Sequence, residues 1–134
     1  MARDLSITRV YNATPQQLWD AWTQPEQLAR WWGKRGWNAK PESIELDVRP
    51  GGTFRVTTVS DEDGSEMTNE GTYDEVQPPH RLTFGETVVT FTKLDDGRTE
   101  MHFHTTTEAQ DELFQRMSKG VESAFDRLEE ALAP

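Results

Sequence analysis

The feature that most constrains this fold is a long amphipathic segment that follows an extended run of β-strand patterning. Between residues 107 and 132, apolar side chains recur at helical spacing and charged side chains lie away from them. The apolar stripe consists of Phe114, Met117, Val121, Ala124, Phe125, Leu128 and Leu132. We expect Thr107 and Gln110 to cap a helix of about 24 residues, which would be roughly 36 Å long. In a chain of 134 residues, a sheet can pack against such a helix only if the sheet curves around it.

Residues 41 to 107 show the two-residue alternation that is typical of β-strands. Ile44, Leu46 and Val48 alternate with polar residues, and further alternating runs follow. The runs are separated by turn sequences at residues 49–52, 61–64, 78–79 and 95–97. A preceding strand is expected at residues 5–12. Six strands joined by short loops after residue 40 favour a meandering antiparallel sheet.

Two short helices are expected between the first strand and the rest of the sheet. Residues 14–17 (TPQQ) place a Thr at the N-cap, Pro at the first helical position and Gln at the third, which is capping-box chemistry. Pro25 begins a second helix, with Trp31 and Trp32 at helical spacing and Gly33 at its end.

Charge and composition exclude several classes of function. The chain has 24 acidic and 14 basic residues and a net charge of -10, which disfavours nucleic-acid binding because Lys and Arg must neutralise phosphates. Its lack of Cys excludes disulfides, thiolate metal sites and Cys nucleophiles. No signal-peptide pattern and no apolar run of about 18 residues is found. We therefore expect one cytoplasmic domain over residues 1–134, with no membrane insertion.

Several segments match a known family pattern in order along nearly the whole chain. They are ATPQQLWDAW (13–22), WWG (31–33), LDVRPGG (46–52), GTYDEVQPPHRL (71–82), VVTF (88–91) and GRTEM (97–101). On these segments the chain resembles the family named for the C-terminal domain of activators of the Hsp90 ATPase. Two positions depart from that pattern: Thr105 stands where the family often has His, and Gly120-Val121 where it often has Gly-Trp.

The resemblance implies the helix-grip fold of the START-like and birch-pollen-allergen (SRPBCC) superfamily. This α+β fold is a curved antiparallel sheet of about six to seven strands around a long C-terminal helix, with two short helices after the first strand. Members of the superfamily share an apolar cavity between sheet and helix, which holds lipids, polyketides, hormones and similar molecules. The resemblance therefore implies a small apolar or amphipathic ligand.

The inward-facing side chains are the candidate ligand-binding residues. On the strands they are Phe54, Val56, Tyr73, Val89, Phe91, Met101 and Phe103, and on the last helix Met117, Val121 and Phe125. Two interpretations remain open at this stage. These side chains either fill a solid core, as most apolar stripes do, or line a cavity.

The segment from Arg30 to Lys40 has the most unusual local composition, with four basic residues, three Trp and no acid. We expect Trp31, Trp32 and Trp37 near the mouth of a cavity, where Lys34 or Arg35 offers charge to an anionic headgroup. The alternative is that Trp31 and Trp32 cap the core while the cations are solvated.

Other candidate sites favour ordinary structural interpretations. Glu100, His102 and His104 share one face of a strand, but that face is opposite the apolar one, so we expect solvent exposure and no metal. Seven acids between residues 61 and 75 are expected to be solvated. Among them Glu70, beside Asn69, is the candidate for a pocket acid. No catalytic or cofactor-binding motif is present, and no cofactor is expected.

Three hypotheses for function follow. The first is a non-catalytic binding module for a small apolar or amphipathic molecule. The second is a chaperone-regulating or protein-interaction domain, as the family name implies, which predicts a filled core and a functional outer surface. The third is a cavity enzyme of the cyclase or hydrolase type, which predicts a buried ionisable group beside the substrate.

Overall fold

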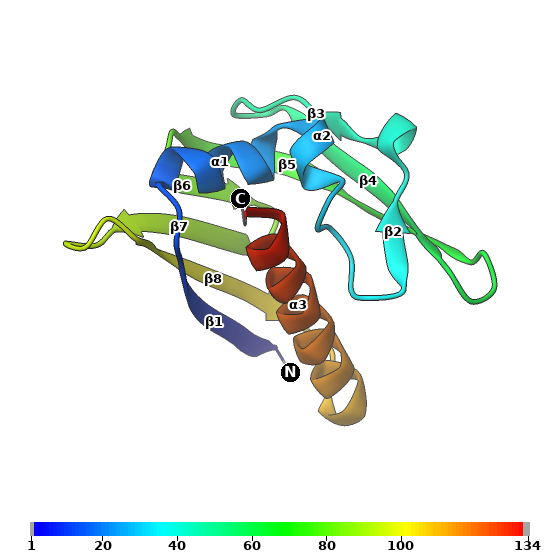
Figure 1. The fold of residues 1–134 in the computed structure, drawn as a ribbon. Helices are drawn as coiled ribbons and strands as arrows, with labels where there is room; N and C mark the ends of the chain where they lie inside the picture. The colour runs from blue at the N-terminus through cyan, green and yellow to red at the C-terminus, as the bar shows by residue number, and fades with distance from the viewer. Residues whose placement is uncertain (1, 133–134) are drawn as a thin grey trace.

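An eight-stranded antiparallel sheet curls around one long helix in the computed structural model, which describes residues 2–132 (Figure 1). The strands are β1 (Arg3–Tyr11), β2 (Trp37–Ala39), β3 (Glu45–Leu46), β4 (Thr53–Ser60), β5 (Glu66–Gln77), β6 (Arg81–Phe84), β7 (Thr87–Lys93) and β8 (Thr99–Thr107). Their order in the sheet is β1-β8-β7-β6-β5-β4-β2, and β3 also pairs with β4. The helix α3 (Asp111–Leu132) lies across the concave face. The predicted helix-grip fold is confirmed.

Two short helices, α1 (Pro15–Thr23) and α2 (Pro25–Leu28), follow β1 as predicted. The capping box of α1 is formed in both directions. The backbone N–H of Gln17 donates to Oγ1 of Thr14 at 3.1 Å, and the backbone N–H of Thr14 donates to Oε1 of Gln17 at 2.8 Å. The helix α2 is shorter than predicted, because residues 29–31 form a turn instead of continuing the α-helix, and Trp32 follows this turn.

The strand β5 joins two halves of the sheet. Its residues 66–72 pair with β4, whereas its last residues pair with β6 after a register shift between Tyr73 and Val76. A turn before β4 is fixed by Gly52, where a Cβ atom would clash with the carbonyl oxygen of Asp47. Only glycine fits that close approach of two backbone segments.

Two sequence-based boundaries are wrong. The strand expected around Ile44, Leu46 and Val48 is reduced to the two residues of β3, because the preceding residues form a 3₁₀ turn (Pro41–Ser43). The last helix begins at Asp111, since Thr107 still belongs to β8 and its hydroxyl accepts from the backbone N–H of Ala109 at 3.1 Å. The carbonyl oxygen of Gln110 accepts the first bond from the helix, from the N–H of Leu113 at 3.2 Å.

The core lies between the concave face of the sheet and the helices. The inward-facing side chains predicted on the strands are all buried: Phe54, Val56, Tyr73, Val89, Phe91, Met101 and Phe103. At the end covered by α1, the rings of Trp19 and Phe91 meet edge to face at 6.3 Å between centroids. Such packing of aromatic rings supplies much of the core of a chain that is poor in aliphatic residues.

The helix α3 is tied to the strands and loops on both of its sides. Toward β1, the Arg9 guanidinium pairs with the Asp126 carboxylate at 2.7 Å. Toward β2, the Arg127 guanidinium donates to the carbonyl oxygens of Gly33 at 2.9 Å and Trp37 at 2.8 Å, and to Oδ1 of Asn38 at 3.1 Å. These bonds fix the C-terminal half of the helix over the open side of the sheet.

No helix in the described range is long and apolar enough to cross a membrane. The cytoplasmic location therefore stays a prediction from the sequence.

Candidate functional site

The two halves of α3 differ in burial, and this difference creates a pocket. In the C-terminal half, Ala124, Phe125 and Leu128 are buried, whereas no residue between 111 and 123 is buried. Two apolar side chains of that N-terminal half, Met117 and Val121, are only partly covered by the core. Between them and the strands lies a cavity of about 850 Å³, which is within the usual size range of small-molecule sites.

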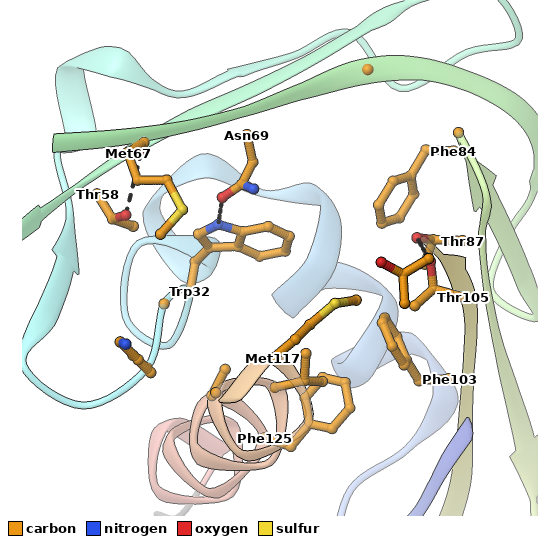
Figure 2. A pocket seen from close by; sticks show the side chains of 18 of the residues that line it. Trp32, Thr58, Met67, Asn69, Phe84, Thr87, Phe103, Thr105, Met117 and Phe125 are labelled. Carbon is orange, nitrogen blue, oxygen red and sulfur yellow. Dashed lines mark hydrogen bonds between the residues drawn. The ribbon is translucent and has the colours of Figure 1, made fainter. Parts of the chain in front are cut away.

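Aromatic side chains dominate the walls of this pocket (Figure 2). They are Trp22, Trp31, Trp32, Trp37, Phe54, Phe84, Phe103 and Phe125. Aliphatic and thioether side chains add to the apolar lining: Met67, Ala109, Leu113, Met117, Val121 and Ala124. Met67 and Leu113 are 48% and 60% exposed, and they are two of the three large apolar side chains that the described surface exposes. Exposed apolar area is thus concentrated at the opening of the pocket.

The aromatic rings support one another. Trp22 and Trp31 lie 4.7 Å apart between centroids, the rings of Phe54 and Phe84 stack at 5.0 Å, and Trp32 packs against Phe54 at 5.3 Å. Rings held in such contact have few alternative rotamers. The pocket is therefore largely preformed.

Polar groups stand at two separate places in the wall, as Figure 2 shows. On one side, the indole N–H of Trp32 donates to Oδ1 of Asn69 at 3.3 Å. On the other side, the hydroxyls of Thr87 and Thr105 hydrogen-bond each other at 3.0 Å. The hydroxyl of a third lining threonine, Thr58, donates to the carbonyl oxygen of Met67 at 3.3 Å.

The ionisable side chains of the described lining are Lys34, Glu70, Glu86 and Arg116, and each of them is exposed. The other candidate cation, Arg35, does not line the pocket and pairs with the carboxylate of Glu130. The cavity-enzyme hypothesis predicted a buried ionisable group beside the substrate, and the described lining contains none. Asn69 and Glu70, the candidate polar pair, are both exposed.

Arg127 does not line the site but binds a chain segment that does. Its guanidinium is partly buried among the carbonyl groups of the loop that carries Trp32, Lys34 and Trp37. Burial lowers the pKa of Arg127, and Arg35 lowers it further through charge repulsion. The residue nevertheless stays a cation at neutral pH, since an Arg begins far above that range. It therefore acts as a fixed donor that holds the loop against α3.

Eight of the thirteen residues proposed from the sequence line the pocket: Trp31, Trp32, Trp37, Phe54, Phe103, Met117, Val121 and Phe125. The other five, Val56, Tyr73, Val89, Phe91 and Met101, lie in the core outside it, and each is 1% exposed or less. The expected position of Trp31 at the mouth is wrong. Its side chain is 1% exposed, and its indole N–H donates to the carbonyl oxygen of Ala21 at 3.0 Å, which holds it in the interior.

Sequence reasoning missed several lining residues, among them Trp22, Met67, Phe84 and the Thr87–Thr105 pair. Met67 and Asn69 alternate along β5 and so share its inner face. The sequence predicted a strand here, but the acids around these two residues directed attention to a turn and an outer face, and the inward position of Met67 was missed. The acids themselves are exposed as predicted: Asp61, Glu62, Asp63, Glu66, Glu70, Asp74 and Glu75.

The two histidines of β8 lie on the face opposite Met101 and Phe103. Nδ1 of His102 is 2.8 Å from the Thr8 hydroxyl, and Nε2 of His104 is 3.6 Å from an Asp4 carboxylate oxygen. Within residues 2–132, no group of three or more His, Asp or Glu side chains is arranged to hold a metal ion.

Residues 12–133 match the family model described as activator of Hsp90 ATPase homolog 1-like protein. The chain belongs to this family. The match covers nearly the whole chain, so the resemblance inferred from the sequence segments is confirmed. No curated protein matches the chain.

Solved structures share the same fold. A protein from Chromobacterium violaceum is 22% identical with a TM-score of 0.85, covering 98% of this chain and 99% of its own. One from Rhodobacter sphaeroides is 26% identical with a TM-score of 0.80, covering 98% of this chain and 97% of its own. The AHSA1-like protein from Aeromonas hydrophila is 21% identical with a TM-score of 0.84, covering 97% of this chain and 92% of its own.

Proposed function

We propose that this protein binds a small apolar or amphipathic molecule in the pocket beneath the N-terminal half of α3. The observation that carries the proposal is the cavity of about 850 Å³ with its aromatic lining. A helix with an apolar stripe normally buries that stripe against its sheet, but here the pocket-lining residues Met117 and Val121 stay only partly covered. A ligand of suitable size would bury these side chains and the exposed Met67 and Leu113, and so gain hydrophobic free energy.

A variant that fills the cavity tests the proposal. Val121 is partly buried, lies in the middle of α3 and lines the pocket, so Val121→Trp would occupy ligand space without inserting a ring into the closed core. The matched control is Val10→Trp, because Val10 is 41% exposed on β1 and does not line the pocket.

The measurement is a set of amide NMR titrations with dodecanoate, cholesterol hemisuccinate and trans-stilbene. We expect at least one probe to shift the amides of pocket residues in the unmodified protein and in Val10→Trp, and to shift them much less in Val121→Trp. The proposal is rejected if no probe shifts these amides, or if Val121→Trp binds as well as the control.

A second candidate function is regulation of a chaperone ATPase, and the family match is the observation that favours it. It is tested by measuring the ATPase rate of an Hsp90 homologue with and without the protein. A concentration-dependent increase in rate would support this function, and an unchanged rate together with ligand binding in the pocket would reject it.

A further inference from the structure

The two polar places in the pocket wall contain hydrogen-bonding groups that the protein does not fully use. An indole N–H can only donate, so the amide oxygen of Asn69 must be the atom that faces Trp32. The amide nitrogen of Asn69 is therefore left with its two N–H donors. Figure 2 shows the Asn69 side chain on the pocket side of β5, and no described residue is found to accept from that nitrogen.

The hydroxyl groups of Thr87 and Thr105 also keep hydrogen-bonding capacity that the protein does not use. In the bond between Thr87 and Thr105, one hydroxyl donates its hydrogen to the other, so one O–H donor and several lone pairs remain. Thr105 is only 7% exposed and Thr87 is half-buried, whereas Asn69 is exposed. The Thr pair therefore forms a deep polar end of the pocket, and Asn69 forms an outer one. Figure 2 shows the two on opposite sides, with Phe84 and Met117 between them.

The charged side chains at the rim of the pocket favour neither an anionic nor a cationic ligand. The exposed lining cations Lys34 and Arg116 are balanced by the exposed lining anions Glu70 and Glu86. A ligand charge carried to the deep end would lose its hydration, and the Thr hydroxyls there supply no opposite charge. The lining thus favours an uncharged group at the deep end, and its balanced rim charges add no net attraction for an anion.

We propose that the ligand is an uncharged, planar aromatic molecule with oxygen atoms at both ends, one at the Thr87–Thr105 pair and one at Asn69. This inference rests on the proposed function of the pocket. The rings of Trp32, Phe54 and Phe84 offer flat and edge surfaces that suit a planar aromatic molecule. The two polar ends fix its orientation, because each supplies hydrogen bonds that an unsubstituted ring system cannot use.

A matched pair of probes tests whether the two terminal oxygen atoms of the ligand contribute to binding. Trans-4,4′-dihydroxystilbene carries an oxygen at each end, and trans-stilbene has the same shape without them. Dodecanoate represents a flexible anionic ligand. We expect the dihydroxy probe to bind about tenfold more tightly than stilbene, as two modest net hydrogen bonds imply. The dissociation constants are measured by isothermal titration calorimetry, and amide NMR shifts locate each probe.

Two variants remove the polar ends separately. Thr105→Val removes the deep hydroxyl, and its control is Thr106→Val, because Thr106 is the next residue of β8 and does not line the pocket. Asn69→Ala removes the outer donor at an exposed position, and its control is Asn12→Ala, because Asn12 is also an exposed asparagine but does not line the pocket. We expect Thr105→Val and Asn69→Ala to reduce the preference for the dihydroxy probe at least threefold, and both controls to retain it.

The outcomes separate the two proposals. Equal affinity for the two stilbenes, or an unchanged preference in both Thr105→Val and Asn69→Ala, overturns the inferred ligand class. Binding of dodecanoate in the pocket without either stilbene overturns the ligand class but supports the proposed function. If no probe binds, the proposed function fails and the inference fails with it.

Discussion

The hydroxyl group of Tyr11 in β1 donates a hydrogen bond of 3.1 Å to the carbonyl oxygen of Phe125 in α3. This bond joins the first strand to the last helix at the place where the helix becomes buried. The other tyrosine differs, because the buried hydroxyl of Tyr73 has no hydrogen-bond partner among the described residues. Burial raises the pKa of both phenols, so both stay protonated at neutral pH.

Replacing each tyrosine with phenylalanine should therefore change the free energy of unfolding differently at the two positions. Tyr11→Phe loses a buried hydrogen bond and should lower the free energy of unfolding by about 1 kcal/mol. Tyr73→Phe removes an unpaired polar group and should leave stability unchanged or raise it by up to about 1 kcal/mol. Urea unfolding measures both values. A larger loss for Tyr73→Phe than for Tyr11→Phe would contradict the hydrogen-bond assignment.

Arg127 is expected to contribute more to stability than Arg116, which lies on the same helix. Arg127→Ala removes the charged donor from the carbonyl oxygens of Gly33 and Trp37 and should cost about 2 kcal/mol. The control is Arg116→Ala, because Arg116 is exposed and pairs with Glu112 four residues earlier on the same helix; it should cost at most about 0.5 kcal/mol. Hydrogen exchange at the Trp37 amide should become faster in Arg127→Ala alone. Similar losses in both variants would show that the loop does not depend on Arg127.

Gly120 is expected to limit the stability of α3. A Cβ atom at this position would meet only the Lys34 side chain, at 3.8 Å and 3.9 Å, so alanine fits without displacing any atom. Gly120→Ala should therefore raise the free energy of unfolding by roughly 0.5–1 kcal/mol through helix propensity. In the control Gly52→Ala, the new Cβ clashes with the Asp47 carbonyl oxygen and should destabilise the protein. Thermal unfolding of both variants tests this, and a destabilised Gly120→Ala would contradict it.

Asp96 should make the stability of the turn between β7 and β8 depend on pH. Its carboxylate accepts from the backbone N–H of Arg98 at 3.0 Å and from Nε of Arg98 at 2.7 Å, and these bonds lower its pKa below the usual value. A lowered pKa in the folded state stabilises the fold above the unfolded-state pKa of about 3.9. This contribution disappears as the pH falls through the folded-state pKa.

Asp96→Asn should consequently be less stable than the unmodified protein at pH 7, and the difference should shrink as the solution is acidified. Asp95→Asn, which removes the neighbouring charge, is the control for net charge alone. Urea unfolding between pH 7 and pH 3 measures the difference. A difference that stays constant over this range would exclude a role for the lowered pKa.

Much of the fold could be predicted from the sequence, because it depends on interactions between residues that are near one another along the chain. The capping box at Thr14 and Gln17, the turn at Gly52 and the inward alternation of β8 depend on residues that are close together along the chain. Their consequences are therefore visible in short sequence windows. The start of α3 was misplaced, because Thr107 has the composition of an N-cap but remains paired in the sheet opposite Arg3.

The sequence by itself determined the curved sheet, the long helix and the side chains that face inward. Only the tertiary structure decided which of those side chains line a pocket. The sequence pattern treats the adjacent residues Trp31 and Trp32 alike. In the structure, however, the indole N–H of Trp31 donates to the carbonyl oxygen of Ala21 in the interior, and that of Trp32 donates to Asn69 on β5. The partners lie 10 and 37 residues away along the chain. Burial of a side chain depends on such distant neighbours, and periodicity in a short window carries no information about them.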